Sequence, residues 1–440
     1  MTASAPVSYA RRLGLFSATM MVIGGIIGSG IFLNPAVVAQ RVATPALTLT
    51  AWGLGAVIAL IGAFVFAELG ARRPEAGGGY AYLREAFGPL AGFMYAWALL
   101  LVIATGAIAA VGMTFAGYAA ALFGWSPAIE PALAAGAIVV LTAINIRGVR
   151  PAAWTQNVFT LLKLAAIAAL IVAAFLAPAA GAHANAPVVR SGSLVLALGA
   201  ALVPVLFAFG GWQQTNFVAE EMIRPERDLP RALVLGVIAV VAAYLLVNVA
   251  YLRSLGIGGL AASTAPAAET MAAVAGDTGR RIIAAGIVAS TFGFLNLVIL
   301  VTPRVYQAMA RDGLFFSSFA RLHPRWRTPV PALLLQGAWA IALVFLKTYG
   351  QLLDYVVFGD WIFFALVAAS LFVLRRRDGD RPVYFRAPLH PWSTLVFIAA
   401  AIYVVVGSIA SNPGNALRGT GLLLIGIPVF LYWHRRAAVV

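Results

Sequence analysis

The sequence predicts an all-α integral membrane protein of about twelve transmembrane helices. Hydrophobic residues make up 62% of the 440 residues and charged residues only 10%, whereas a soluble domain is about half apolar and a quarter charged. The apolar residues form long blocks, each sufficient to cross a bilayer core of about 30 Å as a helix. These blocks recur along the whole chain, so we expect no separate soluble domain.

The basic residues predict the orientation of the chain. Its net charge of +15 does not indicate nucleic-acid binding, because the arginines lie in short loops between the apolar blocks. Such loops carry more Lys and Arg on the cytoplasmic side of a membrane. Most of the Lys and Arg residues fall on the same side of the membrane as the N-terminus, so both termini are predicted to be cytoplasmic. The chain has no cysteine, which argues against a disulfide-linked partner subunit and a thiolate metal site.

The expected spans follow one another with short connections. In chain order they lie at 14–40, 46–70, 89–118, 130–146, 154–178, 195–222, 231–253, 281–308, 332–348, 355–374, 392–410 and 418–434. An even number of spans places both termini on the same side of the membrane.

Two of these spans carry glycine clusters. The first contains the run GGIIGSGIF at 24–32, and the sixth contains FAFGGW at 207–212. Glycine costs about 1 kcal/mol relative to alanine inside a helix, so both clusters mark places where a helix can break. Matching breaks in two halves predict a transporter built from inverted repeats with discontinuous first and sixth helices. We expect a cytoplasmic N-terminus at 1–13, five-helix repeats at 14–178 and 195–374, and two extra helices at 392–434.

A broken helix offers peptide groups to a ligand, because each unsatisfied group in hydrocarbon costs several kcal/mol. The N–H groups that begin the second half-helix suit a carboxylate, and the carbonyls that end the first suit an ammonium group. An α-amino acid carries both. The predicted substrate-binding residues are the donors Gly28, Ser29 and Gly30 and the acceptors Ile26, Phe207, Ala208 and Gly210.

Other interpretations of these residues remain open. Gly24 and Gly28 form a small-xxx-small motif that lets two helices approach closely, so the glycines can be packing points. Phe207 and Trp212 flank the second break. They can close over a ligand, or as aromatic residues they can pack in the core or face lipid.

Lys163 is the candidate coupling residue. It lies nine residues after Trp154, a rise of about 13 Å at about 1.5 Å per residue, and a cation at that depth costs on the order of 3 kcal/mol. Unlike arginine, lysine can lose its proton. It would act as a proton-linked switch or as a fixed cation in the place of a coupling sodium. The alternative is a structural lysine held by carbonyls.

Further polar residues lie within the spans. Ser290 and Thr291 can ligate a cation or contact Lys163, but bonding back to their own helix is an equal alternative. Asp360 is an intramembrane carboxylate whose partner the sequence does not identify. The histidines lack metal-ligand spacing, and no metal or cofactor is expected. The segment 68–88 is expected to be a flexible cytoplasmic connector with a short helix.

The chain resembles the amino acid–polyamine–organocation transporters, and within them it is most similar to bacterial L-type amino acid transporters. Five runs carry the resemblance and appear in family order: GGIIGSGIF (24–32), AELGARRPEAGGGYAYLREAFG (67–88), QNVFTLLKL (156–164), FAFGGWQQTNFVAEEMIRPERDLPRA (207–232) and ARDGLFFSSFARLHPRWRTPVPA (310–332). They cover the first ten expected helices.

The resemblance implies that unwound first and sixth helices hold an amino acid. It carries the carboxylate to Gly28, Ser29 and Gly30 and makes Phe207 a gate. It also places Lys163 at the family's lysine associated with sodium-independent transport. In animal relatives a cysteine tethers a glycoprotein, so this chain is similar to the free-standing bacterial form of an inner membrane. No acidic residue is evident beside either break, so we expect a neutral substrate.

Several functions stay in competition. Within transport, the chain can be a proton-coupled symporter or an amino acid–polyamine exchanger. A channel, or a sensor that binds amino acids without moving them, is a different class. An enzyme is least expected, because no nucleophile–base pair or metal cluster is visible. The sequence leaves open the identity of the amino acid, the coupling ion with its stoichiometry, and the oligomeric state.

Overall fold

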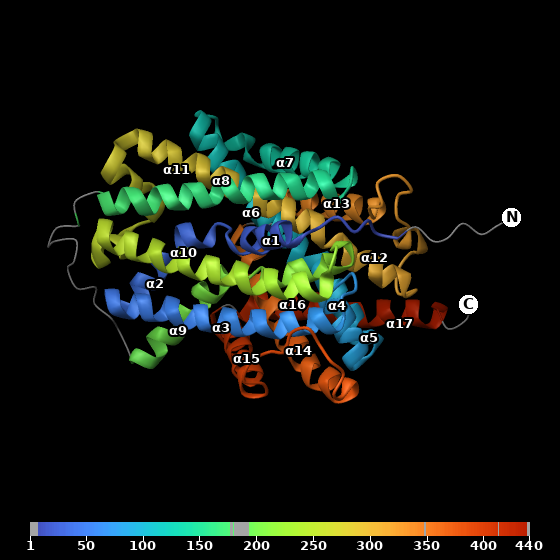
Figure 1. The fold of residues 1–440 in the computed structure, drawn as a ribbon. Helices are drawn as coiled ribbons and strands as arrows, with labels where there is room; N and C mark the ends of the chain where they lie inside the picture. Colours follow the sequence, from blue (N-terminus) through green and yellow to red (C-terminus); the bar gives the residue numbers. More distant parts are fainter. Residues whose placement is uncertain (1–7, 177–178, 180–192, 347–348, 412, 438–440) are drawn as a thin grey trace.

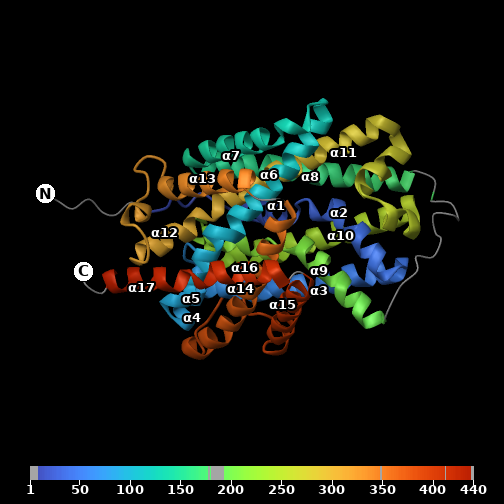
Figure 2. The same ribbon diagram turned by 180° about the vertical axis from the view of Figure 1, so that it is seen from behind.

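The protein is a bundle of helices that lie roughly along one axis (Figure 1). The structure is a computed structural model that describes residues 8–176, 179, 193–346, 349–411 and 413–437. The expected span ends 177–178 and 347–348, and positions 1–7 of the expected N-terminal segment, lie outside these residues. In both views the N-terminal and C-terminal ends lie at the same end of the bundle (Figures 1 and 2).

Among the described residues, the first half of the chain forms ten helical elements and the second half eleven. The first are α1 (Leu15–Ile26), α2 (Gly30–Val42), α3 (Pro45–Arg72), α4 (Gly79–Phe87), α5 (Pro89–Ala98), the π-helix η1 (Leu99–Ile103), α6 (Ala104–Phe123), the 3₁₀ helix η2 (Pro127–Ile129), α7 (Glu130–Ile146) and α8 (Val149–Leu176). The second are α9 (Leu194–Phe209), the 3₁₀ helix η4 (Trp212–Glu221), α10 (Pro225–Ala262), α11 (Pro266–Val301), α12 (Pro303–Arg311), the 3₁₀ helix η5 (Ser317–Ala320), α13 (Val330–Leu346), α14 (Tyr349–Asp378), α15 (Trp392–Ser411), α16 (Pro413–Leu424) and α17 (Gly426–Ala437).

The all-helical membrane fold is confirmed, because among the described residues ten helices are long and apolar enough to cross a bilayer. The pair α1 and α2, bent by 41°, makes an eleventh span. The expected span 332–348 falls on α13, which is apolar but has only 17 residues. The count of twelve and the inverted repeat therefore stay predictions.

The broken first span lies in the middle of the bundle (Figures 1 and 2). Helix α1 packs against α8, α10 and α11, and α2 packs against α9 and α10. In turn α10 packs against α3, and α11 packs against α6 and α8. Because long helices enclose it, the interruption between α1 and α2 is screened from the lipid side of the bundle.

The third span contains a π-helical segment. The π-helix η1 separates α5 from α6, and the Thr105 hydroxyl donates to the Leu100 carbonyl at 2.8 Å. A π turn accommodates one residue more than an α turn and is frequent at functional sites. It therefore changes which residues of α6 face the interior.

The connector at 68–88 contains the expected short helix, α4, but it is packed into the bundle, so the expectation of a flexible segment was wrong. Helix α3 continues to Arg72, and Gly77 to Leu83 are buried. The Gly77 N–H donates to the Phe217 carbonyl at 3.1 Å, and a Cβ on Gly78 would lie 2.9 Å from the Asn216 Cβ. The glycines therefore bring this segment against η4 instead of giving it freedom.

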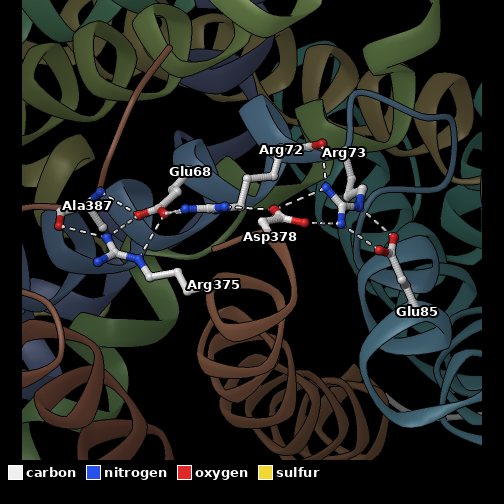
Figure 3. Close-up of polar contacts among 7 residues, drawn as sticks. All are labelled: Glu68, Arg72, Arg73, Glu85, Arg375, Asp378 and Ala387. Carbon is white, nitrogen blue, oxygen red and sulfur yellow. Dashed lines mark hydrogen bonds and ion pairs between the residues drawn. The ribbon is translucent and has the colours of Figure 1, made fainter. Parts of the chain in front are cut away.

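A buried ion-pair cluster joins α3 to α14 at the end of the bundle where the chain termini lie (Figures 1 and 3). Glu68, which is fully buried, accepts from Arg72 at 2.7 Å, from Arg375 at 2.5 Å and from the Ala387 N–H at 2.7 Å. Both oxygens of this carboxylate therefore accept hydrogen bonds, and two of the three donor residues are charged.

The cluster continues toward α4 (Figure 3). Asp378 accepts from Arg72 and from Arg73, each at 2.7 Å, and Arg73 also contacts Glu85 at 2.6 Å. The hydrogen bonds that Arg73 donates to Glu85 and Asp378 raise the pKa of its guanidinium. Three carboxylates face three guanidinium groups, so the cluster has no net charge and fixes the end of α14 to α3 and α4.

We expect Glu68→Gln to lower the free energy of unfolding by about 3–5 kcal/mol, the effect of removing one partner of a buried ion pair. The amide would remove the carboxylate partner of Arg375 and leave Arg72 with Asp378 alone. A thermal melt of the purified protein in detergent measures this as a fall in Tm. Glu226→Gln, which changes an exposed carboxylate at the start of α10, is the control. Equal melting temperatures for the two variants would contradict the prediction.

Candidate functional site

The first span breaks where its glycine cluster predicts. Helix α1 ends at Ile26 and α2 begins at Gly30. Between them the Gly28 N–H donates to the Ile26 carbonyl at 2.9 Å. Gly28 is therefore already engaged in a turn. In the described part of the chain the N–H groups of Ser29 and Gly30 have no protein acceptor, so these two are the donors that the break leaves open.

The sixth span breaks after Phe209. Gly210 is extended, and Gly211 has φ 115°, a conformation that side chains disfavour. The Gly210 N–H donates to the Phe207 carbonyl at 3.2 Å. The chain continues as the 3₁₀ helix η4 rather than as an α-helix, so the second half of this span has a different register from the one that an α-helical continuation would give.

The two breaks touch each other. A Cβ on Gly211 would lie 2.1 Å from the Gly25 carbonyl oxygen, and one on Gly30 would lie 3.1 Å from the Ala208 Cα. Gly24 meets α8 instead, because its Cβ would lie 2.0 Å from the Gln156 side chain. The alternatives posed by the sequence are therefore not exclusive: the glycines permit close packing and lie at breaks.

A cavity of roughly 100 Å³ lies beside the crossing point. By this measure one water occupies about 10–15 Å³, so the cavity has room for a small polar molecule. Both breaks, η1, α6 and α14 contribute to its walls. Seven of the predicted substrate-binding residues line it, namely Ile26, Gly28, Ser29, Gly30, Phe207, Ala208 and Gly210.

Trp212 is the predicted binding residue that the structure does not bring to the cavity. Its indole is buried against Phe66, Phe364 and Phe397, with ring centroids 5.6 to 6.4 Å apart. The turn at Gly211 directs the side chain toward α3 and α15. Trp212 therefore packs behind Phe364, which lines the cavity.

Lys163 is fully buried and binds the first break. Its Nζ donates to the carbonyls of Gly24 at 3.0 Å and Ile27 at 2.6 Å. The Ser290 hydroxyl donates to the same Ile27 carbonyl at 3.3 Å. Thr291 instead bonds back to Ile287 within α11 at 2.8 Å. Lys163 and Ser290 thus meet at one carbonyl, and Thr291 follows the alternative of intrahelical bonding.

Sequence reasoning missed Tyr244. Its hydroxyl lies 3.1 Å from the Ile26 carbonyl oxygen and 3.2 Å from that of Ala208, so it joins the two breaks. A tyrosine within an apolar helix looks like a packing residue, and no local signal distinguishes this one.

Asp360 was noticed in the sequence but not placed at the site. It lines the cavity from α14, and its carboxylate has no hydrogen-bond or ion-pair partner among the described residues. Gln213 and Gln214 also line the cavity, and the Gln213 side chain accepts from the Gly211 N–H at 3.0 Å. The fold thus brings an acidic residue to the cavity from a distant helix, which the sequence beside the breaks does not reveal.

Comparison with known proteins gives a consistent result over nearly the whole chain. The family model described as amino acid permease matches residues 13–430. The serine/threonine exchanger SteT of Bacillus subtilis (strain 168) is 32% identical over 431 residues, covering 97% of this chain and 98% of that protein. Large neutral amino acids transporter small subunit 2 of Homo sapiens is 32% identical over 450 residues, covering 98% and 82%. The b(0,+)-type amino acid transporter 1 of Homo sapiens is 31% identical over 418 residues, covering 92% and 84%.

We expect Gly211→Ala to destabilise the protein by at least about 1–3 kcal/mol, the cost of holding a non-glycine residue in a left-handed conformation. The added methyl also collides with the Gly25 carbonyl. Thermal melts in detergent measure the loss. Gly421→Ala, at an exposed position on α16 with open space around it, is the matched control and should melt at or slightly above the wild-type Tm, because alanine is favoured over glycine inside a helix. An unchanged Tm for Gly211→Ala would contradict the crossing of the two breaks.

Proposed function

This chain belongs to the amino acid permease family, and from that premise we propose that it carries neutral amino acids across the inner membrane of a bacterium by alternating access. The family and the matched relatives are transporters, not enzymes. The remaining question is which chemical features of this chain suit which substrate and which driving force.

The open peptide groups at the crossing point carry the proposal. Ser29 and Gly30 present N–H groups to the cavity at the start of α2, where the helix dipole favours a carboxylate. The proposed acceptors for the ammonium group are the carbonyls of Ile26, Phe207, Ala208 and Gly210. Those of Phe207 and Ala208 each accept one protein hydrogen bond and keep a second lone pair for a ligand. An α-amino acid would satisfy both sets at once, with Phe207 over it as a gate.

The position of Lys163 supports sodium independence. Carbonyl and hydroxyl oxygens are the ligands that a hard cation takes, and here Lys163 Nζ already binds the carbonyls of Gly24 and Ile27. Ser290 contributes a hydroxyl to the same place. A fixed ammonium group thus occupies the set of oxygens that a coupling ion would need. Thr291, the third predicted coupling residue, donates instead to the Ile287 carbonyl of its own helix.

The charges at the site and the names of the relatives both favour a neutral substrate. Lys163 brings one positive charge to the break and Asp360 one negative charge to the cavity, so a zwitterion leaves the site balanced. The names of the serine/threonine exchanger and of the large neutral amino acids transporter describe neutral substrates for those relatives. An amino acid–polyamine exchanger is the second candidate, since the Bacillus relative is named as an exchanger.

We further propose the inverted-repeat organisation at 14–178 and 195–374, with 392–434 as additional helices and both termini cytoplasmic. The chain has no cysteine, so it cannot form a disulfide with a partner subunit. We therefore propose that it works without one.

In liposomes, the purified protein should take up labelled neutral amino acids saturably when the lumen holds unlabelled substrate, at the same rate in sodium and in choline buffer. Counterflow of this kind requires a carrier, so a channel or a non-transporting sensor would not produce it. Stimulation by luminal substrate without a pH gradient would favour exchange over proton symport. Uptake that depends on a sodium gradient would contradict the role assigned to Lys163.

Lys163→Met should abolish uptake, because the Gly24 carbonyl would lose its donor and the Ile27 carbonyl would keep only Ser290, in a medium where each unsatisfied group costs several kcal/mol. Uptake assays in liposomes of matched protein content measure the effect. Arg280→Met removes an exposed cation on α11 and should transport normally. Full uptake by Lys163→Met would show that the lysine is dispensable at the break.

A further inference from the structure

The carboxylate of Asp360 is the ionisable group that the described residues present to the cavity. It has no hydrogen-bond or ion-pair partner among them, and a half-buried acceptor in such surroundings is stabilised by a donor. Its neighbours on the same wall, Val356, Trp361 and Phe364, are hydrophobic. A hydrogen-bond donor that enters the cavity therefore finds one strong acceptor on this wall.

Asp360 lies on a wall that is separate from the two breaks. Helix α14 packs against η1 and α6, and α6 contributes small residues to the cavity at Ala104, Ala107 and Ala110. The breaks present peptide groups, which suit the main chain that all amino acids share. The wall of α6 and α14 is where a side chain has room.

We infer that Asp360 selects the substrate by accepting a hydrogen bond from its side chain, so that the preferred substrates are neutral amino acids with a hydroxyl or carboxamide donor. The inference rests on the proposed function, since it takes the main chain to be held at Ser29 and Gly30. An apolar side chain would leave the carboxylate unpaired, and a site built to bind a hydroxyl discriminates against the analogue that lacks it.

The charges near the cavity favour a neutral donor over an ammonium group. Lys163 already supplies a cation at the break, and with Asp360 the two charges cancel. A cationic amino acid would bring a net positive charge into a site walled mainly by hydrophobic residues, where an unbalanced charge is costly. A hydroxyl satisfies the carboxylate without adding charge.

The test compares isosteric pairs of substrates. Unlabelled threonine, valine, serine, alanine and lysine compete with a labelled amino acid for uptake into liposomes that contain the full-length protein. Threonine should compete at a concentration lower than valine by about tenfold or more, the effect of one hydrogen bond to a charged group, and serine should exceed alanine similarly. Equal competition by threonine and valine, or preferred competition by lysine, would overturn the inference.

Substitutions attribute the preference to this residue. Asp360→Leu should bring the threonine-to-valine ratio close to one, and Asp360→Asn, which keeps a neutral acceptor oxygen, should give an intermediate ratio. Asp380→Leu removes an exposed carboxylate in the loop after α14 and should keep the wild-type ratio. A wild-type ratio in Asp360→Leu would overturn the assignment.

The outcomes separate this inference from the proposed function. If the wild-type protein takes up no amino acid saturably, the proposed function fails. If it transports amino acids without distinguishing threonine from valine, only the role of Asp360 fails. The wild-type ratio decides the matter even where a variant does not fold.

Discussion

The structure depends on satisfying the peptide groups of two helices that open in the middle of a membrane protein. Water is not available there to bind them, so each must find a protein partner or a ligand. Lys163, Ser290 and Tyr244 supply donors to carbonyls at the breaks, and turns take up further groups. Within the described residues, the N–H groups of Ser29 and Gly30 are left without a protein acceptor. These are groups that a substrate carboxylate can satisfy.

The sequence predicted this arrangement where the signal was local. Glycine clusters indicated both breaks, and a lone cation deep in a span indicated Lys163, because each is anomalous within its own helix. The direction of Trp212 was not predictable, since it depends on the φ of Gly211 and on η4 being a 3₁₀ helix. Asp360 and Tyr244 became visible only once the fold brought distant helices to one place. The residue type alone does not predict the direction in which either side chain points.

The two charged regions of the interior serve different purposes. In the cluster around Glu68, each carboxylate meets guanidinium groups (Figure 3), which fixes the end of α14 and leaves nothing for a ligand. On the same helix, Asp360 has no such partner within the part of the chain that the structure describes. A firmly held helix thus carries an unsatisfied acceptor, and the rigidity of one site gives the other a defined position relative to the breaks.

The π-helix in the third span decides which residues of α6 reach the cavity. Each residue advances an α-helix by about 100°, and η1 holds one residue more than regular winding would. Winding the same residues as a regular α-helix would therefore rotate Ala104, Ala107 and Ala110 out of the cavity wall. Deleting one residue within η1 would instead remove the π turn and leave the rest of α6 facing as before, so a chain one residue shorter at this point is compatible with the same cavity wall.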